Sequence, residues 1–211
     1  MTIFFDLDGT LCDVKESRKK IMFRCLDKYG LPKITRDEYR KALQEVTLNK
    51  KLETRYPIFK SIFEDKGCFY KNKVQKALKE YKKEILSKIY LYPDAENVLR
   101  NLDISKVLVT NGPSRSQWDK INKLNIEECF SGIIISGEFG YSKPDSKIFE
   151  HAKKIAECCN GFFVGNSPRY DIYGAKKAGL KTILVDRNGE KKPDCSPDYK
   201  IKNLNQLNEI V

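Results

Sequence analysis

Apolar and polar residues alternate in blocks along most of this chain. Consecutive apolar residues at 3–5 are typical of a parallel strand buried on both faces. Similar apolar runs recur at 106–112, 132–136, 161–166 and 180–186. Between them, apolar residues return at helical spacing, which predicts helices over 94–102, 114–124, 145–158 and 169–178, and a short strand and a last helix within 198–211. Strands that alternate with helices predict an α/β fold with a doubly wound parallel sheet.

The stretch between the first strand and residue 93 has a different pattern. Val74, Leu78, Tyr81 and Ile85 recur at helical spacing among lysines and glutamates, and no strand alternation is clear there. This pattern predicts several amphipathic helices. We therefore expect a sheet domain formed by residues 1–13 and 92–211, interrupted by an all-helical insertion at 14–91.

Net charge changes this picture little. The chain has 211 residues and a formal net charge of +11, from 40 Lys and Arg against 29 Asp and Glu. A basic surface can serve nucleic acid or steer small anions. The basic residues are spread out, with no run of five or more, so a nucleic-acid partner is not expected.

The lengths of the apolar runs and the spacing of the cysteines indicate in which cellular compartment the protein is expected. No apolar stretch approaches the length that spans a bilayer, and Asp6 interrupts the first apolar run at once, unlike a secretory leader. The seven cysteines include no C-x-x-C pair, which argues against both a zinc site and a disulfide framework. We expect a protein of the reducing cytoplasm with free thiols and no membrane partner.

Chemically reactive residues follow the predicted strands. The carboxyl ends of parallel strands form one edge, where α/β proteins place their sites. The residues that reach this edge are Asp6, Asp8, Thr110, Asn111, Gly112, Lys143, Asn166 and Asp171. In such a set, one carboxylate can attack phosphorus and another can transfer protons. Mg²⁺ would neutralise the clustered acids, and lysine and hydroxyl donors would hold a phosphoryl group.

Four ordered motifs carry a family resemblance. DLDGTL at 6–11, TNG at 110–112, KPD at 143–145 and G-N-S-x-x-x-D at 165–171 together resemble the haloacid dehalogenase superfamily, and they span nearly the whole chain. The helical insertion resembles the cap of phosphoglycolate-phosphatase-like members. The resemblance implies a Rossmann-type core and identifies residues 14–91 with that cap.

The resemblance also implies roles. Asp6 matches the nucleophile and a metal ligand, and Asp8 matches the general acid/base, with its backbone carbonyl on the metal. Thr110 and Lys143 match the phosphoryl-binding groups, and Asp171 matches a metal-binding acid of the fourth motif. True dehalogenases generally lack the second aspartate, so Asp8 favours a phosphatase.

One position departs from the family pattern. The fourth motif usually begins with Asp where this chain has Asn166. An amide oxygen can still ligate Mg²⁺ but brings no charge, so weaker metal binding is expected. Asn111 and Gly112 are expected beside Thr110 in the phosphoryl site. Arg18, which opens the insertion, could bind a second anionic group, but we favour a solvated helix residue.

These observations lead to one principal function and two alternatives. The principal one is a Mg²⁺-dependent phosphatase that hydrolyses a small phosphorylated metabolite through an aspartyl-phosphate. One alternative is a phosphotransferase of the phosphoglucomutase type, and the other is a non-catalytic binding protein that uses the basic surface. The sequence names neither the phosphomonoester nor the oligomeric state.

Overall fold

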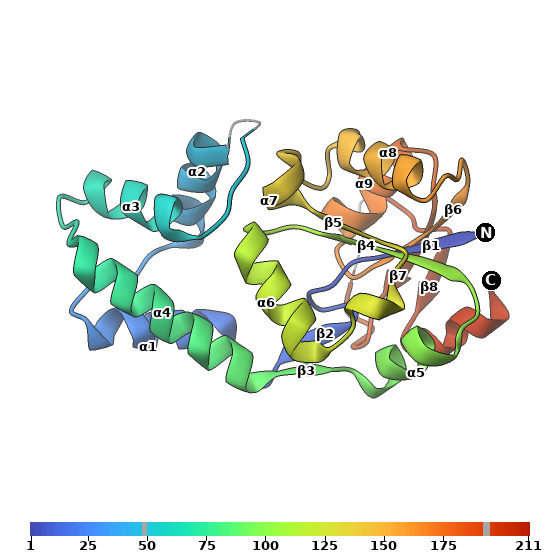
Figure 1. The fold of residues 1–211 in the computed structure, drawn as a ribbon, viewed down its shortest axis with the longest axis horizontal. Helices are drawn as coiled ribbons and strands as arrows, with labels where there is room; N and C mark the ends of the chain where they lie inside the picture. The colour runs from blue at the N-terminus through green and yellow to red at the C-terminus, as the bar shows by residue number, and fades with distance from the viewer. Residues whose placement is uncertain (48–49, 192–194) are drawn as a thin grey trace.

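The structure, a computed structural model, describes residues 1–47, 50–191 and 195–211. It consists of a sheet layered between helices and a group of helices beside it (Figure 1). The sheet has six parallel strands in the order β5-β4-β1-β6-β7-β8. In that order they are Gly132–Ile135, Ser105–Thr110, Thr2–Phe5, Gly161–Gly165, Lys181–Val185 and Tyr199–Ile201. The predicted fold class, a doubly wound parallel sheet, is confirmed.

Both faces of the sheet are buried, which explains the unbroken apolar runs in the strands. Along β1, Ile3 and Phe5 belong to one core cluster and Phe4 to another, because successive side chains of a strand point to opposite faces. The first cluster lies under α5 (Pro93–Asn101), α6 (Ser114–Leu124) and the 3₁₀ helix Leu204–Glu209. The second lies under α8 (Ser146–Ile155) and α9 (Gly174–Lys177).

Short elements complete the sheet part. The 3₁₀ turn Glu127–Cys129 precedes β5, and α7 (Ser136–Phe139) follows it. The predicted helix over 169–178 is divided into a π-helical segment, Pro168–Tyr173, and α9. The predicted helix over 114–124 matches α6 at both ends.

Among the residues described, the inserted part contains four helices, and it lies to the left of the sheet in Figure 1. They have a core of their own, distinct from the two clusters of the sheet. Phe59 and Phe63 are fully buried in it, with ring centroids 6.2 Å apart. The helices are α1 (Arg18–Lys28), α2 (Arg36–Thr47), α3 (Tyr56–Asp65) and α4 (Lys71–Lys88). The division into a core domain and a helical cap at 14–91 stays our proposal, and we use the two names for these parts below.

Two sets of backbone hydrogen bonds join cap and core. A two-stranded antiparallel ribbon, β2 (Cys12–Val14) with β3 (Ile89–Leu91), carries the chain into and out of the cap. This ribbon is not predicted by the pattern of apolar residues in the sequence. A second contact, called the strap below, consists of Leu52 and Glu53. The Leu52 amide donates to the Gly137 carbonyl at 2.7 Å, and the strap carbonyls accept from the amides of Ser114 and Arg115.

Within the described residues, no helix is both long enough and apolar enough to cross a bilayer.

Truncation of a buried residue in the cap tests how much the packing of the cap core contributes to the stability of the protein. We expect Phe59→Ala to lower the free energy of unfolding by about 3–5 kcal/mol, because it removes a fully buried ring and leaves a cavity. The measurement is urea denaturation. Tyr70→Ala, at an exposed cap position, is the control and should change stability by less than about 0.5 kcal/mol. Equal losses for the two variants would contradict the prediction.

Candidate active site

The three central strands are β4, β1 and β6, and their carboxyl ends lie side by side at one edge of the sheet. From β1, the later strands are added outward on both sides, so this edge is a topological switch point. β1 lies between β4 and β6, so Asp6, which follows β1, is flanked by the ends of both neighbours. Its amide donates to the Val164 carbonyl of β6 at 2.9 Å, which extends the ladder by one residue. Ligands of open α/β sheets bind at such a switch point, so the fold itself selects this edge.

Asp6 is buried, with 6% of its surface exposed, and both carboxylate oxygens are bonded. Oδ1 accepts from Lys143 Nζ at 2.7 Å, and Oδ2 accepts from Thr10 Oγ1 at 2.8 Å. Burial raises the pKa of Asp6 to about 6; Lys143 opposes this shift and Asp171 adds to it. The charge on this carboxylate is therefore held by Lys143 in a site shielded from water.

Lys143 lies between two carboxylates. Its Nζ is 2.7 Å from Asp6 Oδ1 and 2.7 Å from Asp171 Oδ1, and only 2% of the residue is exposed. Burial acts to lower the pKa of Lys143, but the Asp171 and Asp6 carboxylates outweigh it and raise the pKa above its usual value. A permanently charged ammonium at this position suits the binding of a phosphoryl group.

The side chain of Asn111 holds the Lys143 loop against β4. Its amide donates to the Lys143 carbonyl at 2.9 Å, and its oxygen accepts from the Lys143 amide at 2.9 Å. In this structure the side chain of Asn111 positions Lys143, and its contact with substrate stays a prediction. The backbone of Gly112 is similarly engaged, because its amide donates to Ser136 Oγ at 2.9 Å.

The fourth motif approaches the same point from β6. Asp171 is 1% exposed, and its Oδ2 accepts from the Ser167 amide at 2.8 Å. A Cβ at Gly165 would collide with Asp171, so glycine is required there. Asn166 packs against Gly9, where a Cβ would again have no room and φ is +84°. The two glycines let the first and fourth motifs approach each other closely.

Asp8 lies at the opening toward the cap and pairs with two cations. Its Oδ2 is 2.6 Å from Lys120 Nζ of α6, and its Oδ1 is 2.9 Å from the Arg18 guanidinium of α1. Burial alone would raise the pKa of Asp8, but Lys120 and Arg18 outweigh it and hold the pKa well below its usual range. The preference for a solvated Arg18 is wrong, because Arg18 bonds Asp8 and Asp13.

Two residues of α6 were missed by the sequence analysis. Gln117 is fully buried, and its amide donates to Thr110 Oγ1, to the Asn111 carbonyl at 3.0 Å and to Asp8 Oδ2 at 3.2 Å. Lys120 Nζ also donates to Gln117 Oε1 at 2.7 Å. Their only sequence signal is a spacing of three on a helix that begins beside the second motif. These two side chains link Thr110 to Asp8.

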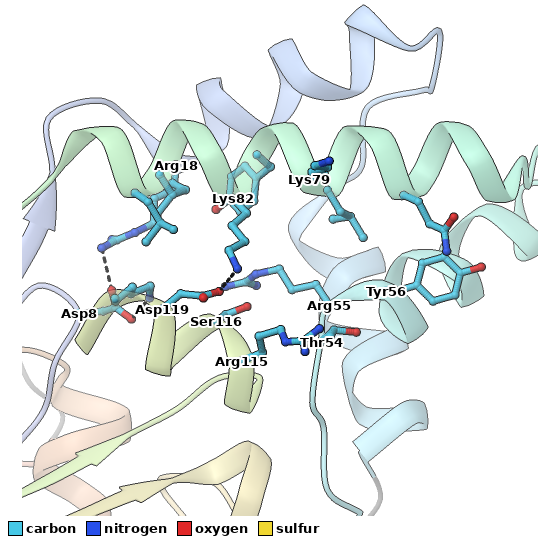
Figure 2. Close-up of a pocket in the computed structure, with 16 residues that line it drawn as sticks. Asp8, Arg18, Thr54, Arg55, Tyr56, Lys79, Lys82, Arg115, Ser116 and Asp119 are labelled. Carbon is cyan, nitrogen blue, oxygen red and sulfur yellow. Dashed lines mark hydrogen bonds and ion pairs between the residues drawn. The ribbon is translucent and has the colours of Figure 1, made fainter. Parts of the chain in front are cut away.

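A cavity of about 640 Å³ lies between cap and core above this site. Figure 2 shows Arg18, Lys79 and Lys82 on the cap side and Arg115, Ser116 and Asp119 on α6. Asp8 lies at one end of the cavity and Tyr56 at the other. A small molecule in this space would be in contact with Asp8 and both parts of the protein.

The family of this chain is shown by its match to a known protein family. The family described as haloacid dehalogenase-like hydrolase matches residues 3–185. The chain belongs to the haloacid dehalogenase-like hydrolases. The match includes the four motifs, the inserted helices and the sheet up to β7, so the resemblance drawn from the motifs is confirmed.

Relatives within the haloacid dehalogenase-like hydrolases are named phosphatases. The chain is 31% identical over 191 residues to a glyceraldehyde 3-phosphate phosphatase of Pyrococcus abyssi, which covers 86% of this chain and 79% of the relative. It is 34% identical over 127 residues to a phosphoserine phosphatase of Thermus thermophilus. That match covers 56% of this chain and about half, 49%, of the relative's length. The expected enzyme class, phosphoric monoester hydrolase, is confirmed at this level.

The haloacid dehalogenase-like fold recurs in solved structures. A 2-haloacid dehalogenase from Pseudomonas syringae pv. Tomato DC3000 superposes with a TM-score of 0.73 at 24% identity. The superposition covers 99% of this chain and 96% of that one. At this identity the likeness supports the fold alone, with the inserted helices included.

The role of Lys120 can be tested against a neighbour on α6. We expect Lys120→Met to lower kcat for p-nitrophenyl phosphate by about 10- to 100-fold, because Asp8 and Gln117 lose the cation that fixes their orientation. Lys123→Met changes an exposed lysine of the same helix and should leave kcat unchanged. If Lys120→Met retained full kcat, the link between Lys120 and Asp8 would have no catalytic value.

Proposed function

We propose that this protein is a Mg²⁺-dependent phosphatase that hydrolyses a small organic phosphomonoester through an aspartyl-phosphate. The single observation that carries the proposal is the buried contact of Asp6, Lys143 and Asp171, with Asp8 two residues beyond Asp6. The named relatives, which include phosphatases of glyceraldehyde 3-phosphate and phosphoserine, support this class of substrate.

In the first half of the reaction, a carboxylate oxygen of Asp6 attacks phosphorus. The P–O bond to the alcohol breaks as the new P–O bond to Asp6 forms, and Asp8 in its protonated form gives its proton to the departing alkoxide. The ammonium group of Lys143 lies beside Asp6, where it stabilises the negative charge on the phosphoryl oxygens during the transfer. Thr10, bonded to the other Asp6 oxygen, fixes the direction of attack.

In the second half, water replaces Asp6 on phosphorus. Asp8, now a carboxylate, takes a proton from the water as its oxygen attacks, and the P–O bond to Asp6 breaks. Inorganic phosphate leaves, and Asp6 is a carboxylate again. Lys120 and Arg18 lower the pKa of Asp8, which keeps it in the carboxylate form that this half needs but makes it a weaker base. Its acid role in the first half requires that Lys120 and Arg18 loosen their hold on Asp8, and an anionic substrate in the cavity would compete for both cations.

The donor set suits Mg²⁺. Among the described residues no three Asp, Glu, His or Cys side chains gather into a metal cluster. The two acids that we propose as ligands are Asp6 and Asp171, whose carboxylates both contact Lys143. Mg²⁺ typically binds through one or two carboxylates, waters and substrate phosphate, so this number is sufficient. The Asn166 side chain and the Asp8 carbonyl would complete the oxygen ligands. When bound, the ion would neutralise charge on the phosphoryl oxygens.

Removal of the nucleophile and of the metal tests the proposal directly. We expect p-nitrophenyl phosphate hydrolysis to require Mg²⁺, to stop in EDTA, and to fall at least about a thousandfold in Asp6→Asn, because no carboxylate is left to take the phosphoryl group. Phosphate release is the measurement. Full activity of Asp6→Asn in a clean preparation would exclude this mechanism.

Asn166 offers a test of the metal site. Asn166→Asp restores the acid that the family pattern has at this position and adds one negative charge beside the proposed ligands. We expect the Mg²⁺ concentration for half-maximal activity to fall about tenfold. Isothermal titration of Mg²⁺ onto wild type and variant gives a second readout. Unchanged Mg²⁺ affinity would place Asn166 outside the metal site.

A further inference from the structure

The cavity between cap and core is strongly cationic. Its lining includes six cationic side chains but only two carboxylates, Asp8 and Asp119. The six are Arg18, Arg55, Lys79, Lys82, Arg115 and Lys120. The catalytic edge of the sheet lies beyond Asp8, so these cations surround the part of a substrate that is not the transferred phosphoryl group.

The two carboxylates of the lining already have cationic partners. Asp8 pairs with Lys120 and Arg18, and Asp119 pairs with Lys82 at 2.6 Å across the cap–core boundary. Arg115 lies 3.9 Å from Glu53, and both of these side chains are mostly exposed. Arg55 and Lys79 have no carboxylate within 4.0 Å among the residues that the structure describes.

Arg55 is held in place without being neutralised. It precedes α3, and one of its guanidinium nitrogens donates to the Tyr39 hydroxyl at 2.7 Å. The guanidinium also lies 5.9 Å from the centre of the Tyr81 ring. Both contacts orient a charged group, but neither supplies a negative charge. Figure 2 shows the Arg55 side chain extending across the cavity toward α6.

A half-buried guanidinium that is oriented and has no carboxylate partner is available to pair with an anionic ligand in the cavity. We propose, on the basis of the phosphatase function above, that the natural substrate carries a second anionic group, a carboxylate or another phosphate, which Arg55 binds inside the cavity. The planar fork of arginine matches either group through paired hydrogen bonds. Lys79, which also lines the cavity, adds positive charge but is exposed.

Matched probes isolate the second charge. The Asp6→Asn variant, which does not turn substrate over, is titrated calorimetrically in Mg²⁺ with 3-phosphoglycerate and with glycerol 1-phosphate. These share a three-carbon chain and differ in a carboxylate against a hydroxymethyl group. Glycerol 1,3-bisphosphate keeps the same chain and its central hydroxyl and carries a second phosphate ester in place of the carboxylate. The pair 6-phosphogluconate and sorbitol 6-phosphate extends the chain to six carbons.

We expect the doubly anionic member to bind at least about tenfold more tightly in one or more pairs, and the favoured anion identifies the group. Arg55→Gln on the same background should reduce that ratio toward one, and Arg55→Lys should keep most of it. Tyr39→Phe, which removes the hydrogen bond but keeps the cation, should also keep the preference. Arg40→Gln, an exposed cap arginine paired with Asp37, should leave the ratio unchanged.

Equal affinities within every pair, the absence of saturable binding, or a preference that survives Arg55→Gln would overturn the inference. Hydrolysis of p-nitrophenyl phosphate by the wild type reports separately on the proposed function. Turnover of that ester without any preference for doubly anionic ligands would support the phosphatase function and contradict the inference that the substrate carries a second anionic group. Loss of that turnover would count against the proposed function, whereas the affinity ratios decide the inference itself.

Discussion

The site depends on one buried ammonium group. Lys143 Nζ lies between the carboxylates of Asp6, which follows β1, and Asp171, which lies in the π-helical segment after the neighbouring strand β6. Without it, two negative charges would face each other in a site almost closed to water, at a cost of several kcal/mol. Much of the surrounding structure serves this contact. Asn111 fixes the lysine loop from both sides, and the glycine at 165 gives Asp171 the space to approach.

Most of the fold, and the convergence at this ammonium, could be predicted from the sequence. Apolar runs such as 3–5 need cover on both faces, and parallel strands deliver Asp6 and Asp171 to one edge whatever the details of packing. Lys120 could not be predicted, because a lysine in an amphipathic helix looks like any solvated residue until the rotation of α6 is known. The β2–β3 ribbon was missed because three-residue strands are too short to show a period.

Asp8 is one of the residues through which cap and core interact electrostatically. Lys120 holds it from the core and Arg18 from the cap, so its protonation depends on where the cap lies. The sequence could not reveal this dependence, because the docking of two packed units is set by surface shape over many residues. Arg18 was therefore misjudged, although the helix that carries it was predicted. In the mechanism that we propose, the same carboxylate would couple proton transfer to the position of the cap.

The strap at Leu52 and Glu53 has a mechanical consequence. A body joined only by the β2–β3 ribbon could rotate about it, as domains do on a hinge. The strap is a second backbone connection, and it restrains that rotation while its hydrogen bonds with Gly137, Ser114 and Arg115 persist. Wide opening of the cavity then requires that these bonds break locally. The exchange of large molecules therefore depends on the lifetime of three backbone hydrogen bonds, together with the ion pairs that Arg18 and Lys82 form across the same boundary.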